Sequence, residues 1–190
     1  MLQADHSGWQ RLAVAVALWS FAYAAYRAYY ALGGEFGMIG EPISRELFRS
    51  VNAIGAAIIF VAGIVPLAAL RFDGVRRILP VICWIAAVGC CMHALVDMTL
   101  RVFSLTGVHP TQLPTTFWRS FDRHASDVQD LLLNEPWFLI QGLLWGALGV
   151  AIVQASRRRL WKLSAVTASL LLTIVGVLSG LDIIGSFHIA

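Results

Sequence analysis

The chain has 190 residues, of which 58% are hydrophobic and only 13% are charged, and its mean hydropathy is +0.73. A soluble domain carries about 25% charged residues, so this composition excludes an ordinary soluble domain and favours an integral membrane protein. The net charge of +3 comes from short loops between apolar runs. It therefore indicates membrane topology, and we expect no nucleic-acid partner.

Five apolar runs are each long enough for a helix that crosses a bilayer core of about 30 Å. They cover residues 12–32, 47–70, 78–104, 135–155 and 163–187. No linker between them is long or polar enough to separate two domains. We therefore predict an all-α bundle of about five transmembrane helices, in which residues 1–190 form a single integral membrane domain. In the last run, Gly176 and Gly180 are spaced for close helix packing and predict a seam.

The first run also has features of a secretory signal peptide. Arg11 precedes an apolar stretch, and Ala22-Tyr23-Ala24 imitates a cleavage site. Aromatic residues continue beyond that point as far as Tyr30, which a cleaved leader does not need. We predict that the first run is retained as a helix.

The connections between the runs differ in length and polarity. Residues 33–46 contain glycine, proline and glutamate, and this composition breaks a helix. The longest polar segment covers residues 105–134, and Glu135-Pro136 after it has the pattern of a helix start. Within this segment, Asp127 and Asp130 are predicted to lie on a solvated helix outside the membrane.

Two basic loops set the expected orientation. Residues 71–77 contain three arginines, and residues 156–162 contain three arginines and one lysine. The loops are two runs apart, so both face the same side, which the positive-inside rule assigns to the cytoplasm. We expect a multi-pass protein of the cell membrane with its N-terminus in the cytoplasm and its C-terminus outside.

Three titratable or charged residues inside the third run share one helical face. His93, Asp97 and Arg101 follow one another at a spacing of four residues, which places them on one stripe. Such groups are costly inside a membrane and need a partner or a function. A histidine with carboxylates is also a ligand set for non-haem iron, but a second histidine is missing at this depth. We expect no metal and no cofactor.

Every run places polar side chains toward its outer end, which predicts a polar cavity that opens to the outer side of the membrane. The candidate catalytic residues are His93, Asp97, Glu135 and Asp182, and the candidate substrate-binding residues are Arg27, Asn52, Trp84, Gln141 and Trp145. A simpler interpretation stays open for Arg49, Arg101 and Glu135, because side chains near helix ends often extend to the interface.

The later runs resemble the EXPERA-type membrane proteins, the family of the sterol Δ8–Δ7 isomerases. The segment Gly89-Cys-Cys-Met-His93-Ala-Leu-Val-Asp97 is similar to the family's Gly-x-x-His-x-x-x-acid motif, with Asp in place of Glu and one extra residue after the glycine. Glu135 and Leu144-Trp145-Gly146 are similar to an acid that leads into a Leu-Trp-Gly segment, although Glu135 lies about one turn further away.

A basic loop and a span with an aspartate, here residues 157–162 and Asp182, complete the resemblance, which covers residues 83–187. Small membrane-bound terpene cyclases, which also use acids inside a helical bundle, are a related similarity. Both resemblances imply the same chemistry, the delivery of a proton to an isoprenoid in a membrane pocket.

The spacing also divides the acids by role. Asp97 lies between two potential cations on its own face and is expected to stay ionised. Asp182 has no cation nearby in the sequence, and burial would retain its proton. Asp182 or Glu135 is then the predicted proton donor, with His93 as acid or base. The alternative is that Asp182 pairs with an arginine of the first or second run.

These observations lead to one expected function and two alternatives. We expect a membrane-embedded isomerase or cyclase that transfers protons to an isoprenoid, terpenoid or sterol-like lipid, with the lipid bilayer and a hydrophobic small molecule as its partners. The first alternative is a non-catalytic lipid-binding or scaffold protein. The second is a small proton-coupled transporter with Asp97 and Asp182 as its proton sites.

Overall fold

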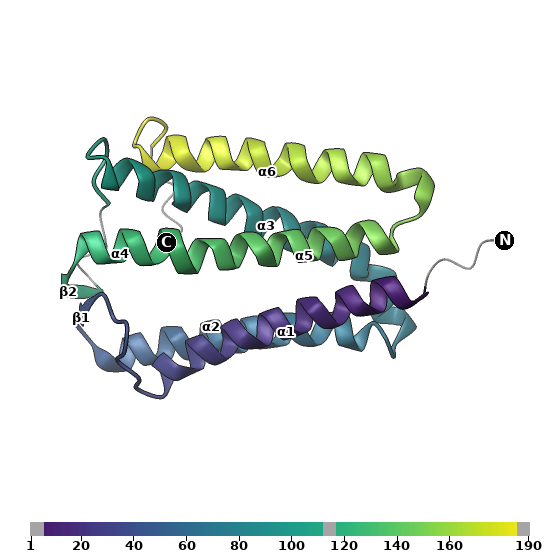
Figure 1. The fold of residues 1–190 in the computed structure, drawn as a ribbon, viewed down its shortest axis with the longest axis horizontal. Coiled ribbons are helices and arrows are strands. Elements are labelled where there is room, and N and C mark those ends of the chain that lie inside the picture. Colours follow the sequence, from purple (N-terminus) through teal and green to yellow (C-terminus); the bar gives the residue numbers. More distant parts are fainter. Residues whose placement is uncertain (1–5, 112–116, 186–190) are drawn as a thin grey trace.

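The computed structural model describes residues 6–111 and 117–185, and these residues form an all-α bundle of long helices (Figure 1). The prediction of the fold class is confirmed. The long helices are α1 (His6–Ala31), α2 (Arg45–Ala68), α3 (Asp73–Leu105), α5 (Glu135–Ile152) and α6 (Arg158–Gly180).

The helices pack in two groups. Helix α1 packs on α2 over most of its length, while α5 and α6 both pack on α3. Figure 1 shows α6 at one edge of the molecule, α1 and α2 at the opposite edge, and α3 and α5 between them. The two groups are joined mainly by contacts between α1 and α5, with fewer between α2 and α3.

The apolar core lies in the half of the bundle where α1, α3 and α5 meet near the N-terminal end of α1. Small and large side chains alternate there, which allows close helix packing. The core residues are Ala13, Val16, Ala69, Leu79, Cys83, Ala87, Trp145 and Leu148. The other half of the bundle has no comparable apolar cluster among the described residues, and it contains the polar side chains described below.

The predicted glycine seam of the last run is confirmed in its position. A Cβ atom added to Gly176 would lie 2.6 Å from Val96 Cγ2, and one added to Gly180 would lie 2.6 Å from Leu100 Cδ1. Both glycines therefore allow α6 to approach α3 more closely than any side chain would permit.

The predicted helix start at Glu135-Pro136 is wrong. The helix begins twelve residues earlier with α4 (Arg123–Gln129), where the Asp122 side chain accepts a hydrogen bond from the Ala125 N–H at 3.0 Å. Helix α4 runs through a π-helical turn, η1 (Asp130–Asn134), directly into α5. An aspartate N-cap explains this start, because it satisfies an N–H group that has no partner inside the helix.

The π-helical turn has a local cause in Pro136. Proline has no N–H, so the carbonyl of Leu132 four residues earlier loses its helical donor. The chain accommodates this with the wider i→i+5 pattern, in which the N–H of Glu135 bonds to the Asp130 carbonyl. The turn lies next to the polar half of the bundle.

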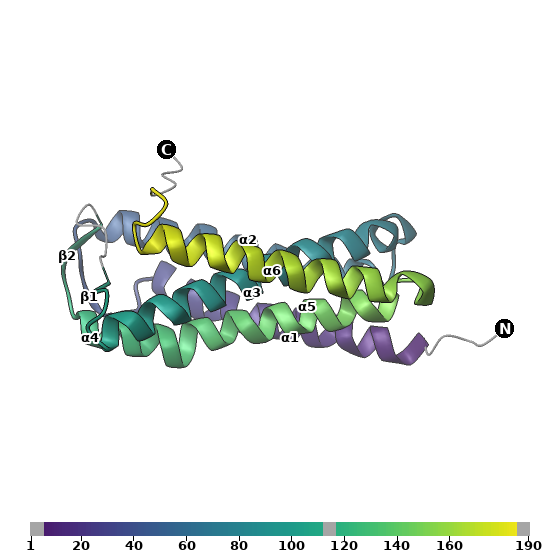
Figure 2. The ribbon, with the colours of Figure 1, turned by 90° about the horizontal axis from the view of Figure 1, so that it is seen from above.

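A small sheet that the sequence did not indicate closes the same half. Strands β1 (Gly40–Pro42) and β2 (Trp118–Phe121) pair antiparallel, with Gly40 opposite Phe121. Figure 2 shows the two strands at the end of the molecule opposite the N-terminus. The sheet ties the connection after α1 to the connection before α4.

Four helical segments are long and apolar enough to cross a membrane, which supports a multi-pass membrane protein. They are Arg45–Ala68, Asp73–Leu105, Arg123–Ile152 and Ala155–Gly180, the last including the 3-10 turn η2 (Ala155–Arg157). Helix α1 has 26 residues but is not among the four, since its tyrosines and Arg27 lower its hydropathy. That α1 crosses the membrane as a fifth span stays a prediction.

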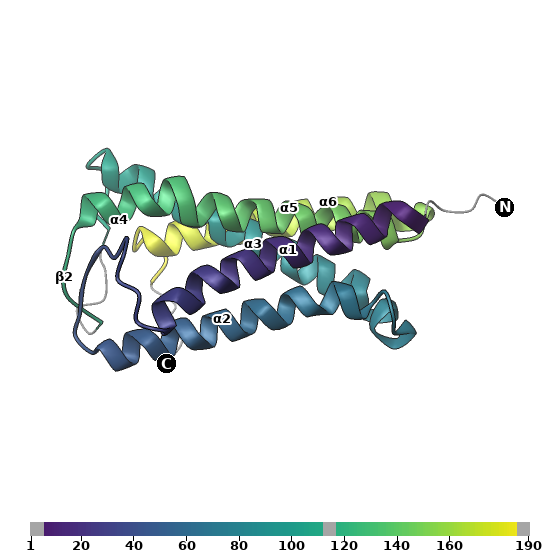
Figure 3. The same ribbon diagram turned by 60° about the horizontal axis from the view of Figure 1, so that its bottom comes forward.

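The two predicted basic loops lie at the same end of the molecule. The turn between α2 and α3 and the turn between α5 and α6 are both next to the N-terminal end of α1 (Figure 3). This is the geometry that the orientation prediction requires. Which side of a membrane this end faces stays a prediction.

Candidate functional site

A cleft of about 510 Å³ lies in the polar half of the bundle, between α1, α2, α3 and the segment that joins η1 to α5. The cleft is lined by Tyr23, Arg27, Gly55, Ile58, Ile59, His93, Asp97, Arg101, Asp130, Asn134, Glu135 and Phe138. Its position agrees with the predicted polar cavity, except that α6 contributes no lining residue.

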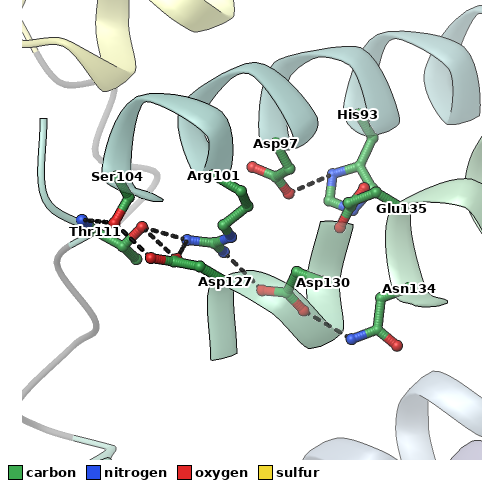
Figure 4. Close-up of polar contacts among 9 residues, drawn as sticks. All are labelled: His93, Asp97, Arg101, Ser104, Thr111, Asp127, Asp130, Asn134 and Glu135. Atoms are coloured by element: carbon green, nitrogen blue, oxygen red, sulfur yellow. Dashed lines mark hydrogen bonds and ion pairs between the residues drawn. The ribbon is translucent and has the colours of Figure 1, made fainter. Parts of the chain in front are cut away.

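Three residues, which we call the cleft triad, come together on one side of this cleft: His93, Asp97 and Glu135 (Figure 4). His93 Nδ1 lies 3.5 Å from Asp97 Oδ2, and His93 Nε2 lies 3.8 Å from Glu135 Oε2. The imidazole is therefore placed between two carboxyl groups, one from its own helix and one from α5.

Burial differs sharply within the cleft triad. The His93 side chain is 47% exposed and faces the open cleft, whereas Glu135 is only 4% exposed. Glu135 Oε2 has no hydrogen-bond partner among the described residues. A buried polar atom without a partner is costly, so this oxygen is a natural contact for a proton, a ligand or a cation.

A second set of residues, which we call the anchor cluster, begins one helical turn further along α3. It consists of Arg101, Ser104, Thr111, Asp127 and Asp130 (Figure 4). Arg101 Nη2 lies 3.0 Å from Asp130 Oδ2, and Arg101 Nη1 lies 3.6 Å from Asp127 Oδ1. Thr111 Oγ1 donates to Asp127 Oδ1 at 2.7 Å, and Ser104 Oγ donates to Asp127 Oδ2.

The anchor cluster corrects the prediction that Asp127 and Asp130 lie on a solvated helix. Asp127, expected on a solvated helix, is 1% exposed, and Asp130 is partly buried. Arg101, for which an interfacial position stayed open, has a side chain that is only 15% exposed and is paired with both carboxylates. The reason is that α4 continues into α5, which carries both aspartates alongside α3 rather than into solvent.

Aromatic and apolar side chains form the rest of the cleft wall. The Phe138 ring meets the His93 ring edge-on at a centroid distance of 4.7 Å. The centroid of the Tyr23 ring lies 5.2 Å from that of Phe138. Helix α2 contributes Ile58, Ile59 and Gly55, and a Cβ atom on Gly55 would lie 3.4 Å from Arg27 Nε. The cleft therefore combines an apolar wall with a charged one, as small-molecule sites usually do.

The five predicted substrate-binding residues are dispersed. Arg27 lines the cleft, and it makes no salt bridge with any residue that the structure describes. Asn52 is buried at 3% exposure and donates from Nδ2 to the Phe48 carbonyl of its own helix. Gln141 Nε2 donates to Ser20 Oγ at 3.0 Å and joins α5 to α1.

The two tryptophans of that set lie elsewhere. Trp84 Nε1 donates to Ser164 Oγ at 3.1 Å, so this ring contacts α6. Trp145 is 2% exposed and belongs to the apolar core. Neither lines the cleft, and both side chains have a packing role instead.

Asp182 departs most from its prediction. The last helix was expected to continue to residue 187, but α6 ends at Gly180, and residues 186 and 187 lie outside the described residues. Asp182 has a left-handed φ of 57° in the turn that follows, and its side chain is exposed. The expected burial of Asp182 is wrong, because Asp182 itself takes the left-handed position that ends the helix. Its N–H bonds to the Ser179 carbonyl at 3.0 Å, and the Ile183 N–H bonds to the Leu178 carbonyl at 2.9 Å.

Several residues of the cleft were not predicted from the sequence. Among them, Asp130, Asn134 and Phe138 follow one another at a spacing of four residues. Asn134 Nδ2 donates to Asp130 Oδ1 at 2.7 Å, so this second stripe is connected as well. The same spacing that revealed the stripe on α3 would have found these residues.

The cleft triad also has the composition of a metal site. One ligand atom from each of its three residues lies within 4.8 Å of the other two. One imidazole and two carboxylates suit a divalent transition metal. The two chemical possibilities, proton transfer and metal binding, use the same three side chains.

Comparison with known proteins identifies no relative of this chain. No family model, curated protein or solved structure matches it.

Proposed function

We propose that the protein is a membrane-embedded isomerase or cyclase that transfers a proton to an isoprenoid or sterol-like lipid bound in the cleft. The observation that carries this proposal is Glu135, whose buried carboxyl oxygen has no hydrogen-bond partner among the described residues and faces His93 across 3.8 Å. Proton transfer to a hydrocarbon needs a protonated acid that water does not reach, and a carboxyl in this position meets that requirement.

Among the described residues, Glu135 makes no ion pair with an arginine. Arg101, one turn beyond Asp97 on α3, is already engaged by Asp127 and Asp130. Asp97 adds a second carboxylate to the same wall of the cleft. The Glu135 carboxyl is therefore not held in an ion pair with an arginine, and its charged-group neighbour across the cleft is the His93 imidazole.

His93 supplies the route by which the proton is replaced and removed. Its Nδ1 faces Asp97, which orients the ring, and its Nε2 faces Glu135. This is the order of groups in an acid–base relay, in which one carboxylate fixes the imidazole and the imidazole exchanges protons with the other partner. The exposed ring edge of His93 is open to a molecule in the cleft.

The reaction balances with these groups alone. The Glu135 O–H bond breaks as a C–H bond forms on an alkene carbon, or as an epoxide oxygen is protonated and its C–O bond opens. The resulting cation then loses a proton from a neighbouring carbon to His93 or Asp97. An isomerase returns a shifted double bond, and a cyclase forms a ring bond before that loss.

The aromatic residues suit the intermediate of such a reaction. Tyr23 and Phe138 present π-systems to the cleft, and these attract a positive charge. Arg101 would oppose a carbocation if its charge were free, but two aspartates neutralise it. Arg27 remains available to donate hydrogen bonds to an oxygen substituent of the substrate, such as a hydroxyl or epoxide group.

A metal centre at the cleft triad is the second candidate. It is favoured by the same compact arrangement, with the three ligand atoms within 4.8 Å of one another. After incubation with Zn²⁺ or Mn²⁺ and extensive dialysis, metal analysis of the purified protein distinguishes the two candidates. One equivalent of metal that is lost in His93→Ala supports the metal centre and counts against Glu135 as a free acid.

Deuterium incorporation tests the proton-transfer proposal. The purified protein in proteoliposomes is incubated in D2O with two probes, a Δ8 sterol and an epoxidised prenyl compound, and the products are analysed by mass spectrometry. A product that carries solvent deuterium at carbon in the wild type, or a cyclised product, and none in Glu135→Gln supports the proposal.

Asp182→Asn is the matched control, because it removes an exposed carboxylate outside the cleft. It should retain the product. If both probes bind but neither reacts, the protein is a lipid-binding or scaffold protein instead. The transporter alternative needs Asp97 and Asp182 on one path, and Asp182 is not among the residues that line the cleft.

A further inference from the structure

A second large concavity lies on the opposite side of α3, between α5 and α6. These two helices contact α3 much more than each other, which leaves a groove of about 620 Å³ between them. Its floor is the stripe Ala87, Cys91 and Leu95 of α3, spaced four residues apart. Small residues of α5, such as Gly146, keep the groove open.

One end of this groove is bordered by Trp161 and carries a positive charge. Trp161 packs against Gly149, where a Cβ atom would lie 2.4 Å from the ring, and its Nε1 donates to the Pro80 carbonyl at 3.3 Å. Lys162 follows directly and lines the groove with an exposed side chain. The indole therefore ends the apolar part of the groove, and the ammonium group stands at its mouth.

The charge of this end extends beyond Lys162. Apart from Asp73, the charged residues that the structure describes at this end are all cations. They are Arg11, Arg71, Arg76, Arg77, Arg157, Arg158, Arg159 and Lys162. An anionic group at the mouth of the groove would thus meet a favourable field as well as one direct partner.

The length of the groove matches one leaflet of a membrane. Its lining runs from Val150 to Leu139 on α5, which is about 16 Å at roughly 1.5 Å per residue. One half of the hydrocarbon core is about 15 Å thick. A single acyl chain whose headgroup lies at the basic end would therefore fill the groove along its length.

We propose that the groove between α5 and α6 binds one anionic phospholipid of the adjacent leaflet, with an acyl chain along Ala87, Cys91 and Leu95 and the headgroup phosphate at Lys162. Basic pockets between membrane helices are suited to anionic headgroups in this way. The site is separate from the cleft and independent of the reaction proposed there.

Native mass spectrometry tests this site directly. The protein is reconstituted in vesicles of equal parts phosphatidylglycerol and phosphatidylethanolamine, extracted in mild detergent and examined for retained lipid. The wild type should retain one phosphatidylglycerol in preference to phosphatidylethanolamine. Lys162→Ala should weaken that retention about fivefold, the effect of one cation near an anionic headgroup.

A second variant tests the apolar part of the site. A Cβ atom on Gly146 would meet only the Ala87 Cβ, at 3.8 Å, so this backbone position has room for a side chain, and Gly146→Leu places one in the groove. It should reduce retention of both lipids to the background level. If that variant does not fold, Ala147→Trp fills the groove from an exposed position.

Arg77→Ala is the matched control, since it removes a cation from the same end of the molecule but outside the groove. It should retain the lipid as the wild type does. Equal retention of the two lipids, or unchanged retention in Lys162→Ala and in the groove-filling variant, would overturn the proposal. A dimer without retained lipid would overturn it too, because a second copy would then cover the groove.

Discussion

The cleft triad and the anchor cluster lie one helical turn apart on α3, and they use their charges in opposite ways. In the anchor cluster, Arg101 contacts two carboxylates and Asp127 accepts hydrogen bonds from two hydroxyl groups. In the cleft triad, the contacts of His93 are 3.5 and 3.8 Å long, and a buried oxygen of Glu135 has no partner in the described chain.

The extent of pairing therefore separates charges with a structural role from charges with a functional one. Both clusters are in the same half of the bundle, so depth alone does not distinguish them. Ion pairing with two carboxylates offsets much of the cost of burying Arg101, although its Nε has no hydrogen-bond partner among the described residues. A carboxyl that has no arginine partner is freer to exchange a proton or contact a ligand. Four experiments test whether the two clusters differ in this way.

The largest expected effect is on stability and comes from Asp127→Asn. Loss of this carboxylate leaves Arg101 in a buried site with one partner fewer, and breaking such a pair costs about 3–5 kcal/mol. Unfolding by SDS in mixed micelles measures the loss. Asp182→Asn, at an exposed position, should change the free energy of unfolding by less than about 0.5 kcal/mol. Equal effects of the two variants would contradict the structural role of the anchor cluster.

Glu135→Gln should separate activity from stability. The amide keeps the shape of the side chain but cannot donate a proton as an acid, so turnover in the deuterium assay should fall about 10²- to 10⁴-fold. The free energy of unfolding should stay the same or rise, because a poorly paired buried acid is removed. A loss of stability as large as that of Asp127→Asn would show that Glu135 is a structural residue.

Double-mutant cycles compare the pairs within each cluster. For His93 and Asp97, whose side chains are 47% and 27% exposed, the coupling energy should be below about 1 kcal/mol. For Arg101 and Asp130, at 15% and 19% exposure, it should be larger, within the range of about 0.5–3 kcal/mol. The reverse order would remove the distinction between the two clusters.

The smallest expected effect belongs to an exposed reference pair. Arg119 Nη1 lies 3.0 Å from Glu41 Oε1 across the small sheet, and both side chains are more than half exposed. Arg119→Ala should cost at most about 1 kcal/mol, and less at high salt. The same unfolding assay at two salt concentrations provides the measurement. A larger cost would mean that the sheet contributes substantially to stability by tying the connection after α1 to the connection before α4.

The sequence predicted the features that depend on helical periodicity. The apolar runs located each of the long helices, although several of the ends differ by five residues or more, and the spacing of four placed His93, Asp97 and Arg101 on one stripe. The glycine seam on α6 was found for the same reason. Periodicity is a local property, so it can be read without knowing how the helices pack.

The features that were missed depend on where helices begin and end. Pro136 is typical of a helix start, yet here a π-helical turn carries the helix past it, and this brings Asp127 and Asp130 to Arg101. Asp182 itself ends α6 by adopting a left-handed φ, which exposes its carboxylate outside the bundle. In both cases one residue permits two structures, and packing across the bundle decides between them.

The π-helical turn Asp130–Asn134 also determines how this segment responds to a change in its length. A π turn contains one residue more than the α turn that it replaces, so it is equivalent to a single-residue insertion. Deletion of the exposed Leu132 would remove that extra residue and rotate everything before it by about 100° relative to α5. Asp127 would then turn away from Arg101, while Glu135 would keep facing His93. The extra residue sets the rotation of α4 relative to α5. A deletion there would separate the contacts of the anchor cluster from those of the cleft triad without changing any side chain of the triad.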